Sequence, residues 1–360
     1  SKNIIDGFDF TSTSPGSLAV GSWNGINVFF TYDNTNIDSN RIGKTSGTSS
    51  IKITNTTAES FGTGIVLGSA SYSYSTTLRN NTIGSIEVVS TAATPRSRFY
   101  GINMYADGYF TLTNNIIGDS AVTASPDCIS VGSLTASGHG HFTGINNEIT
   151  RSPSVTATGN IIRNCRARTN SDSAVCAGIK TNGYGGAYNL QNNTIKNLQA
   201  VSGSTGNSKI YGINYNSTTS FSLQTFKGNT ITNLNAVCGT GIRSGAFGIF
   251  NTKQFSNVDS NFVHDISTNS STPGILGGAV GIYNNGNSIN NRVYNISNIN
   301  STVNNIYAVG ILGSGEVKRN MVYDIQTLTS NTSVIEGIRF IGFYLNSNVV
   351  SLGNAITTNP

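Results

Sequence analysis

Residues 191–198, QNNTIKNL, contain the motif that decides the fold of this chain. An asparagine, a spacer and a branched apolar residue form a short asparagine step, Asn-x-Ile or Asn-x-Val, and ten such steps follow one another at intervals of 28 to 45 residues. The steps begin at Asn40, Asn81, Asn115, Asn160, Asn193, Asn229, Asn261, Asn291, Asn320 and Asn348. A motif that returns every few tens of residues is typical of a protein built from stacked repeats.

A second marker, the dipeptide Gly-Ile, alternates with the asparagine steps. The pairs begin at Gly25, Gly64, Gly101, Gly144, Gly178, Gly212, Gly248, Gly281, Gly310 and Gly337, each 10 to 17 residues before its step. Each unit thus has two short runs of branched apolar residues between clusters of Asn, Gly, Ser and Thr, which predicts short strands joined by turns. Units stacked about 4.8 Å apart align the isoleucines and pair the backbone groups. The sequence therefore predicts an all-β parallel solenoid of about ten coils, with 28 to 45 residues per coil.

The asparagine of each step is expected at a corner of its coil. Asparagine tolerates a left-handed backbone, and stacked side-chain amides can hydrogen-bond to one another along a ladder. The expected structural ladder contains Asn81, Asn115, Asn160, Asn193, Asn229, Asn261, Asn291 and Asn320. A second, partial ladder is expected a few residues after each step, at Asn164, Asn197, Asn233, Asp265, Asn295 and Asp324.

The glycines of the Gly-Ile pairs are expected on the outer surface. Side chains alternate across a strand, so an inward isoleucine places the preceding glycine outward. Ten stacked glycines would leave a bare stripe, and glycine in a strand often marks the close approach of another backbone or a ligand. We therefore expect a neighbouring chain, a covering loop or a glycan to lie against this stripe.

The composition excludes several classes of protein. The 37% hydrophobic and 9% aromatic residues exceed what a disordered chain contains. The net charge of +5 is spread without a basic stripe, which excludes a nucleic-acid partner, and the absence of a run of 18 apolar residues excludes membrane insertion. Cys128, Cys165, Cys176 and Cys238 lack metal-site spacing, so we expect buried thiols or one or two disulfides, with Cys165–Cys176 as the pair to test. We predict no metal and no cofactor.

The two markers resemble the Asn-rich repeats of right-handed parallel β-helix proteins of the bacterial cell surface, which include type IX secretion-like substrates. The resemblance covers about residues 25–350. It implies a single right-handed parallel β-helix over residues 25–360, after an N-terminal strand or cap region at residues 1–24, in a secreted, extracellular protein of the cell surface. The stretch SNVVSLGNAITTNP, residues 347–360, continues the strand pattern. We therefore expect this coil to stack on another subunit, or on more chain if the β-helix of the native protein continues beyond residue 360.

Four fragments resemble the polygalacturonase family of pectin hydrolases. They are ADG (106–108), PDCIS (126–130), GHG (138–140) and GIKT (178–181). The resemblance implies Asp107 and Asp127 as acid–base carboxylates, His139 as an orienting group, and Lys180 as a ligand of the substrate's carboxylate. The family uses a further aspartate where this chain has Pro126, and the matching residues fall at unrelated phases of the repeat. Our first hypothesis therefore contains no catalytic residue.

Two groups of residues are predicted to face a partner. The residue after each Gly-Ile pair becomes apolar in the later coils, at Phe250, Tyr283 and Leu312. A basic cluster, Arg163, Arg166 and Arg168, stands out in a chain with only 10% charged residues and would suit an acidic glycan.

These features lead to a structural or adhesive module of a bacterial surface protein. It would bind a glycan or neighbouring surface protein chains, or associate with itself, through an outer face. The alternative is a polysaccharide-degrading enzyme, a pectinase-like hydrolase or a lyase, that acts on an acidic glycan. Three carboxylates converging in one groove would favour this enzyme.

Overall fold

The computed structural model of the chain describes most of the residues between 2 and 351. The described ranges are 2–13, 23–29, 34–45, 49–56, 59–68, 75–92, 96–105, 108–118, 127–135, 138–148, 154–182, 186–203, 206–216, 222–239, 243–270, 275–300, 306–327, 334–340, 344–346 and 348–351. Apart from one 3-10 turn, η1 (Ile275–Gly277), every regular element in these ranges is a β-strand. Among the described residues no helix is long or apolar enough to cross a membrane.

The strands form three parallel sheets, which we call A, B and C. Sheet A contains β1 (Ile4–Ile5), β2 (Phe8–Ser12), β5 (Arg41–Ile42), β6 (Ile51–Asn55), β9 (Thr82–Ile83), β10 (Ile86–Ser90), β13 (Ile116–Gly118), β14 (Ile129–Gly132), β17 (Ile161–Thr169), β20 (Thr194–Ser202), β23 (Thr230–Cys238), β26 (Phe262–Thr268), β29 (Arg292–Asn298), β32 (Met321–Thr327) and β35 (Val349–Ser351). Sheet B contains β3 (Trp23–Phe29), β7 (Ser60–Gly68), β11 (Ser97–Met104), β15 (Gly140–Asn147), β18 (Ser173–Thr181), β21 (Asn207–Tyr215), β24 (Arg243–Asn251), β27 (Ala279–Asn284), β30 (Tyr307–Gly313) and β33 (Val334–Phe340). Sheet C contains β4 (Thr35–Asp38), β8 (Ser75–Arg79), β12 (Tyr109–Thr113), β16 (Ser154–Thr158), β19 (Tyr188–Gln191), β22 (Gln224–Lys227), β25 (Ser256–Asp259), β28 (Asn287–Ile289), β31 (Glu316–Lys318) and β34 (Tyr344–Asn346).

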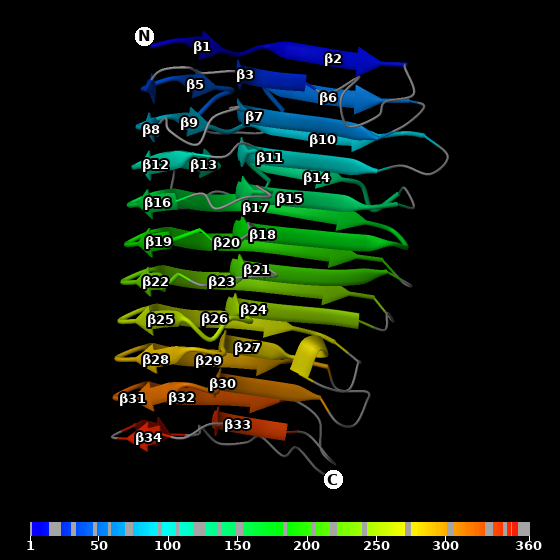
Figure 1. Cartoon of the computed structure of the whole chain (residues 1–360). Helices are drawn as coiled ribbons and strands as arrows, with labels where there is room; N and C mark the ends of the chain where they lie inside the picture. The colour runs from blue at the N-terminus through cyan, green and yellow to red at the C-terminus, as the bar shows by residue number, and fades with distance from the viewer. Residues whose placement is uncertain are drawn as a thin grey trace.

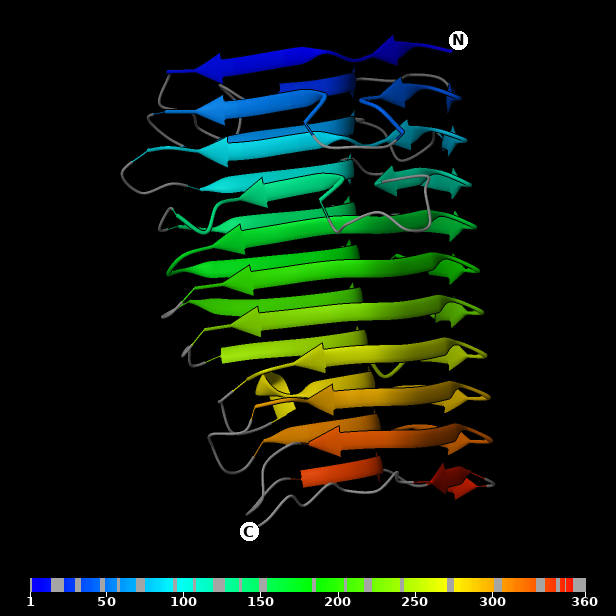
Figure 2. The ribbon, with the colours of Figure 1, turned by 180° about the vertical axis from the view of Figure 1, so that it is seen from behind.

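The chain winds through sheets B, C and A in turn, which confirms the predicted parallel β-helix. Sheet B faces the viewer in Figure 1 and its strands run from right to left, whereas the strands of sheet A run from left to right in the layer behind. Figure 2 shows sheet A from its own side. Because the chain descends as it turns, the coils form a right-handed helix.

The isoleucines of the Gly-Ile pairs form one column of the core. The parallel register stacks each of them on the next, in the order Ile26, Ile65, Ile102, Ile145, Ile179, Ile213, Ile249, Ile282, Ile311 and Ile338. The eight inner members of the column are 0–1% exposed, and the two end members pack against the same core. Parallel stacking of the coils therefore buries the isoleucine side chains, which a single unit could not bury alone.

The glycines of these pairs face the core, so the prediction of a bare outer stripe is wrong. A Cβ placed on Gly212 would lie 2.5 Å from Cγ2 of Ile231, the apolar residue of the next asparagine step. The same contact joins Gly178 to Ile195 at 2.6 Å. The strand pairing skips each glycine, which shows that the backbone departs there from two-residue alternation and turns both the glycine and its isoleucine inward. The two sequence markers are thus contact partners across the core.

The asparagines of the steps form one continuous, buried ladder between sheets C and A. Nδ2 of Asn160 donates to Oδ1 of Asn193 at 3.0 Å, and Nδ2 of Asn193 donates to Oδ1 of Asn229 at 3.0 Å. Each Oδ1 also accepts from the backbone N–H of the asparagine one coil earlier, and each Nδ2 also donates to a sheet C carbonyl, as from Asn193 to Ala157 at 2.9 Å. The same bonds run from Asn40 to Asn348. The ladder therefore satisfies buried amides without any water.

The left-handed backbone of this corner lies one residue before the ladder asparagine, which corrects the expected reason for asparagine at the corner. Positive φ angles of 51° to 67° occur at Ser39, Asn80, Asn114, Gly159, Asn192, Gly228, Ser260, Asn290 and Arg319. The ladder asparagines themselves are not left-handed. Asparagine is required in the ladder because its amide both donates and accepts.

The second polar positions are left-handed themselves. Asn164, Asn197, Asn233, Asp265, Asn295 and Asp324 have φ between 50° and 56°. Nδ2 of Asn197 donates to Oδ1 of Asn164 at 2.7 Å, and Nδ2 of Asn295 donates to Oδ1 of Asp265 at 2.5 Å. These residues form a partial ladder along sheet A, in which Asn164 is buried, and they interrupt the side-chain alternation of the sheet.

The N-terminal strands belong to the same solenoid. Ile4 of β1 pairs with Arg41, and Phe8 of β2 pairs with Ile51, so both strands extend sheet A by one coil. Nδ2 of Asn3 donates to Oδ1 of Asn40 at 2.9 Å, which adds an earlier rung to the asparagine ladder. The region expected as a strand or cap, residues 1–24, thus contributes strands that continue the repeat.

All four cysteines are buried thiols, and a Cys165–Cys176 disulfide is not formed. Cys165 faces the core from sheet A and Cys176 from sheet B. Burial raises the pKa of both thiols, which keeps them protonated. They therefore behave as small apolar core residues.

Candidate functional site

The three predicted arginines lie on one outer face because of the kink at Asn164. On β17, Ile162, Cys165 and Ala167 are fully buried, whereas Arg163, Arg166 and Arg168 are half-buried on the opposite face. The left-handed Asn164 resets the alternation, so the spacing of three and then two residues keeps all three arginines outward.

Arg166 and Arg168 each have a polar partner in the preceding coil. Arg166 forms an ion pair with Asp127, and Nη2 of Arg168 donates to Oγ of Ser130 at 2.5 Å. Partial burial, together with the neighbouring charge of Arg166, lowers the pKa of Arg168. The arginine cluster is therefore a crowded group of cations on sheet A, in which Asp127 offsets part of the charge.

Arg163 begins a longer row that runs down sheet A, which we call the sheet A row. The parallel register places its residues side by side in successive coils: Arg163, Lys196, Thr232, His264, Tyr294 and Tyr323. All six side chains are half-buried on the outer face. The row changes from cationic to aromatic along the β-helix.

The aromatic end of the row is a stack of nearly parallel rings. The ring centroids of His264 and Tyr294 are 4.6 Å apart with planes inclined by 4°, and those of Tyr294 and Tyr323 are 4.7 Å apart with planes inclined by 2°. These separations equal the spacing of neighbouring strands, so the stack follows directly from the register. A rigid aromatic surface results, held by sheet A.

A guanidinium group lies against this aromatic stack. The Cζ atom of the exposed Arg292 lies 5.4–5.5 Å from the ring centroids of Phe262, Tyr294 and Tyr323. Its Nε and Nη2 also donate to the hydroxyl oxygen of Tyr323 at 3.0 and 2.6 Å. A cation held over aromatic rings gains electrostatic attraction from their π faces. Arg292 thus gives the aromatic end of the row a fixed positive charge.

The predicted apolar residues form a largely closed cluster on the outer face of sheet B. Leu312 is 6% exposed, and Phe250 and Tyr283 are half-buried with ring centroids 4.9 Å apart. They pack with buried Phe247, Val280 and Val309, and η1 lies against β24 and β30 of the same sheet. Much of this apolar surface is therefore covered by the chain itself, and a lateral contact through it stays a prediction.

The residues implied by the polygalacturonase resemblance do not form one site in the described part of the chain. Asp107 lies outside the described residues, and Asp127 is paired with Arg166. Nε2 of His139 lies 3.2 Å from Oδ2 of Asp172. Lys180 pairs in register with Asn146, which lies seven residues after His139. His139 and Lys180 are therefore separated by roughly 20 Å along the strand direction.

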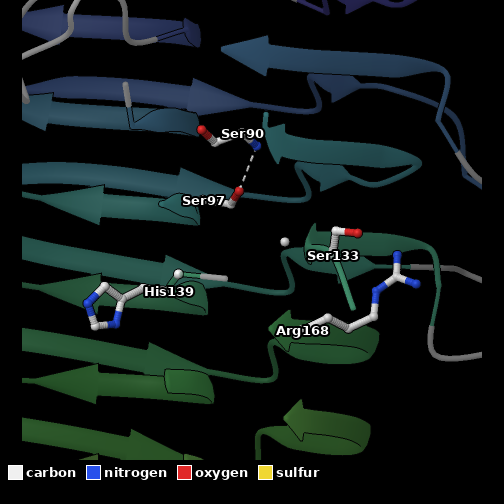
Figure 3. Close-up of a pocket in the computed structure, with 7 residues that line it drawn as sticks. Ser90, Ser97, Ser133, His139 and Arg168 are labelled. Carbon is white, nitrogen blue, oxygen red and sulfur yellow. Dashed lines mark hydrogen bonds between the residues drawn. The ribbon is translucent and has the colours of Figure 1, made fainter. Parts of the chain in front are cut away.

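His139 and Arg168 line a small polar notch at the junction of sheets A and B, together with Ser90, Ser97, Gly132, Ser133 and Gly138. Figure 3 shows the imidazole and the guanidinium pointing in opposite directions from it. The backbone N–H of Ser90 donates to Oγ of Ser97 at 2.9 Å across the junction. These side chains therefore do not converge on a substrate position. Within the described ranges, no group of three or more His, Cys, Asp or Glu side chains could hold a metal ion.

The aromatic part of the sheet A row was missed from the sequence, although a signal for it exists. Every member of the row stands three residues after a ladder asparagine, as Tyr294 does after Asn291. Aligning the repeats on the asparagine steps therefore identifies the row as one column.

Comparison with protein-family models gives no match to this chain, and comparison with curated protein sequences gives none either. The geometry of the surface is therefore the basis for assigning a function.

Proposed function

We propose that this chain is an extracellular structural or adhesive β-helix whose sheet A row binds an acidic glycan. One observation carries the proposal: cationic and stacked aromatic side chains follow one another in adjacent coils on the same outer face. Lys196 and Arg163 can pair with carboxylate or sulfate groups, and Tyr294 and Tyr323 offer apolar ring surface to the C–H faces of sugars. A surface position in a secreted protein suits this chemistry.

The rigidity of the row supports binding of an extended polymer. Each side chain is carried by a strand whose backbone is paired on both sides, so little conformational entropy is lost when a ligand binds. The row repeats at the strand spacing of about 4.8 Å, which offers many equivalent contacts to a chain lying along the β-helix. Several weak contacts on one rigid surface give a high combined affinity.

Removing the two tyrosine rings is expected to weaken binding of acidic glycans. Each lost ring contact should cost about tenfold in affinity, so the double variant Tyr294→Ala, Tyr323→Ala should bind roughly a hundredfold more weakly. Isothermal titration with polygalacturonate, alginate and chondroitin sulfate measures the change. The matched control is Tyr109→Ala, because Tyr109 is 57% exposed but lies on sheet C. Equal losses in the control and the double variant, or no loss in either, would exclude the sheet A row as the binding surface.

Hydrolysis of an acidic glycan is the second candidate function, and one pair of carboxylates favours it. Asp265 and Asp324 stand on sheet A two coils apart, with Asn295 between them, which corresponds to about 10 Å and lies near the upper limit for an inverting glycosidase. However, Asp265 accepts from Asn295 through Oδ1 and contacts His264 through Oδ2 at 2.8 Å. Neither oxygen is left free to protonate a leaving group.

We therefore expect no cleavage of acidic polysaccharides. Incubation with polygalacturonate, alginate and chondroitin should release neither new reducing ends nor unsaturated products, measured by a reducing-sugar assay and by ultraviolet absorbance. If products appear and Asp265→Asn or Asp127→Asn abolishes them, the enzyme hypothesis replaces the adhesive one. Asp259→Asn serves as the control, because Asp259 is a carboxylate on sheet C.

A further inference from the structure

The outer face of sheet B carries a group of polar side chains in its earlier coils, which we call the polar patch. Its residues come from β7, β11, β15, β18 and β21: Thr63, Arg98, His141, Asn146, Lys180 and Asn214. Asn146, Lys180 and Asn214 stand in one row, and Arg98 and His141 in a second. Sheet B faces the viewer in Figure 1, whereas the sheet A row lies on the side seen in Figure 2. The patch is therefore separate from the proposed acidic-glycan site.

Besides Nε of Arg98, which lies in an ion pair with Glu59, four buried atoms of the patch have no hydrogen-bond partner among the described residues. They are Oγ1 of Thr63, Nε2 of His141, Oδ1 of Asn146 and Oδ1 of Asn214. A buried polar group without a partner is costly, and proteins pair nearly all such groups. The asparagine ladder of the same β-helix pairs both its Nδ2 and its Oδ1 atoms. The four unpaired atoms therefore indicate that a group outside the described residues supplies their hydrogen bonds.

The patch has buried members, which we call its floor, and half-buried members, which we call its rim. Thr63 and Asn146 are 0% exposed and form the floor, where Nδ2 of Asn146 donates to Oδ1 of Asn103 at 2.8 Å. Arg98, His141, Lys180 and Asn214 are only half-buried and form the rim. Because Thr63 and Asn146 are 0% exposed, a ligand reaches the atoms of the floor only when the half-buried side chains of the rim turn aside.

The charges around the patch are largely compensated. Nε of Arg98 lies 3.3 Å from Oε1 of Glu59, and the hydroxyl of Tyr100 donates to Oε1 of Glu148 at 3.0 Å. Burial, with Arg98 as the next cause, lowers the pKa of His141 to about 3, so its imidazole is neutral at physiological pH. Burial also lowers the pKa of Lys180, an effect that Glu148 opposes. A neutral ligand therefore fits the patch better than an anion.

The unpaired atoms also indicate the chemical class of the ligand. The amide oxygens of Asn146 and Asn214 require hydrogen-bond donors, while Nε2 of His141 donates or accepts according to its tautomer. Hydroxyl groups meet both needs, because each one donates and accepts. The exposed ring of Tyr105, which directly follows the strand of Arg98, adds apolar surface at the edge. A hydroxyl-rich ring with apolar faces combines these properties.

We infer that the polar patch is a second saccharide site, which binds a neutral sugar unit through the side chains of Asn146, Asn214 and His141. Polar groups placed on rigid strands beside an aromatic ring are typical of small-molecule sites. The inference does not depend on the acidic-glycan site, because the two surfaces share no residue.

The test is binding of neutral monosaccharides to the full chain. Isothermal titration and ligand-observed NMR with glucose, galactose, mannose and N-acetylglucosamine should detect at least one ligand, with a Kd of about 1 mM. Asn214→Ala should weaken this binding about tenfold, and so should Asn146→Ala. The control is Asn257→Ala, because Asn257 is a half-buried asparagine on sheet C.

The outcomes separate this inference from the proposed function. Tyr294→Ala should leave binding of the neutral sugar unchanged, and Asn214→Ala should leave binding of acidic polymers unchanged. Because Asn146 is buried, circular dichroism melting checks that its variant folds, and Asn214→Ala carries the test if it does not. Failure of all four sugars to bind, or equal weakening by Asn257→Ala, overturns the inference and assigns the four atoms to ordered water.

Discussion

Replacing Asn193 with leucine is expected to lower the free energy of unfolding by about 3–6 kcal/mol. Leucine has the same branching at Cγ as asparagine but cannot accept the two bonds that the side chain of Asn193 receives, from the backbone N–H and from Nδ2 of Asn160. It also leaves the carbonyl of Ala157 and one bond to Asn229 without a donor. All these groups are buried at the corner between sheets C and A, so water cannot replace the lost partners.

Urea denaturation followed by circular dichroism measures the global loss, and hydrogen exchange at β17, β20 and β23 measures the local loss. Hydrogen exchange is needed because stacked repeats can open locally before the whole chain unfolds. The control is Asn257→Ala, which removes a half-buried asparagine from an outer face and should cost less than about 1 kcal/mol. Comparable losses in the two variants would show that the ladder does not stabilise the fold.

Replacing Gly212 with alanine is expected to destabilise the β-helix by about 3 kcal/mol or more, although the change adds a single methyl group. That methyl carbon would lie 2.5 Å from the carbonyl oxygen of Gly248 and 2.5 Å from Cγ2 of Ile231. Overpacking a core commonly costs about 1–3 kcal/mol. The cost here reaches the upper end of this range, because the carbonyl belongs to the paired backbone of the next coil. It cannot move without disturbing the backbone hydrogen bonds of sheet B.

The suitable control for this substitution is Gly7→Ala. Gly7 has a φ of 76°, and a Cβ placed on it would meet no atom within 4 Å. Its replacement should therefore lower the free energy of unfolding by only about 1–2 kcal/mol, the cost of an alanine with a left-handed backbone. Urea midpoints of the two variants and the parent chain separate the steric cost from the conformational cost. A smaller loss at Gly212 than at Gly7 would contradict the inward orientation of the glycines.

The candidate site could be predicted from the sequence only in part. Arg163, Arg166 and Arg168 are recognisable because charged residues are scarce, and the structure places all three on sheet A. Tyr294 and Tyr323 lie 29 residues apart, and in the sequence only an alignment of the repeats on the asparagine steps relates them. Only the parallel register brings their rings to 4.7 Å. The unpaired atoms of the polar patch depend on burial and on what the neighbouring coils provide, which no single segment contains.

The repeats in the sequence are sufficient to predict the parallel solenoid, the column of isoleucines and the identity of the ladder asparagines. These features repeat along the chain, and stacking of like on like is the arrangement that buries every isoleucine and pairs every amide. Where the alternation of side chains along a strand is interrupted, the direction in which a residue faces follows only from the folded structure. At Gly212 the strand pairing skips a residue and turns the glycine inward, and at Asn164 a left-handed φ keeps Arg163 and Arg166 on the same face. Alternation is a property of a regular strand, so a local kink, set by packing against neighbouring coils, overrides the two-residue period on which a prediction from sequence depends.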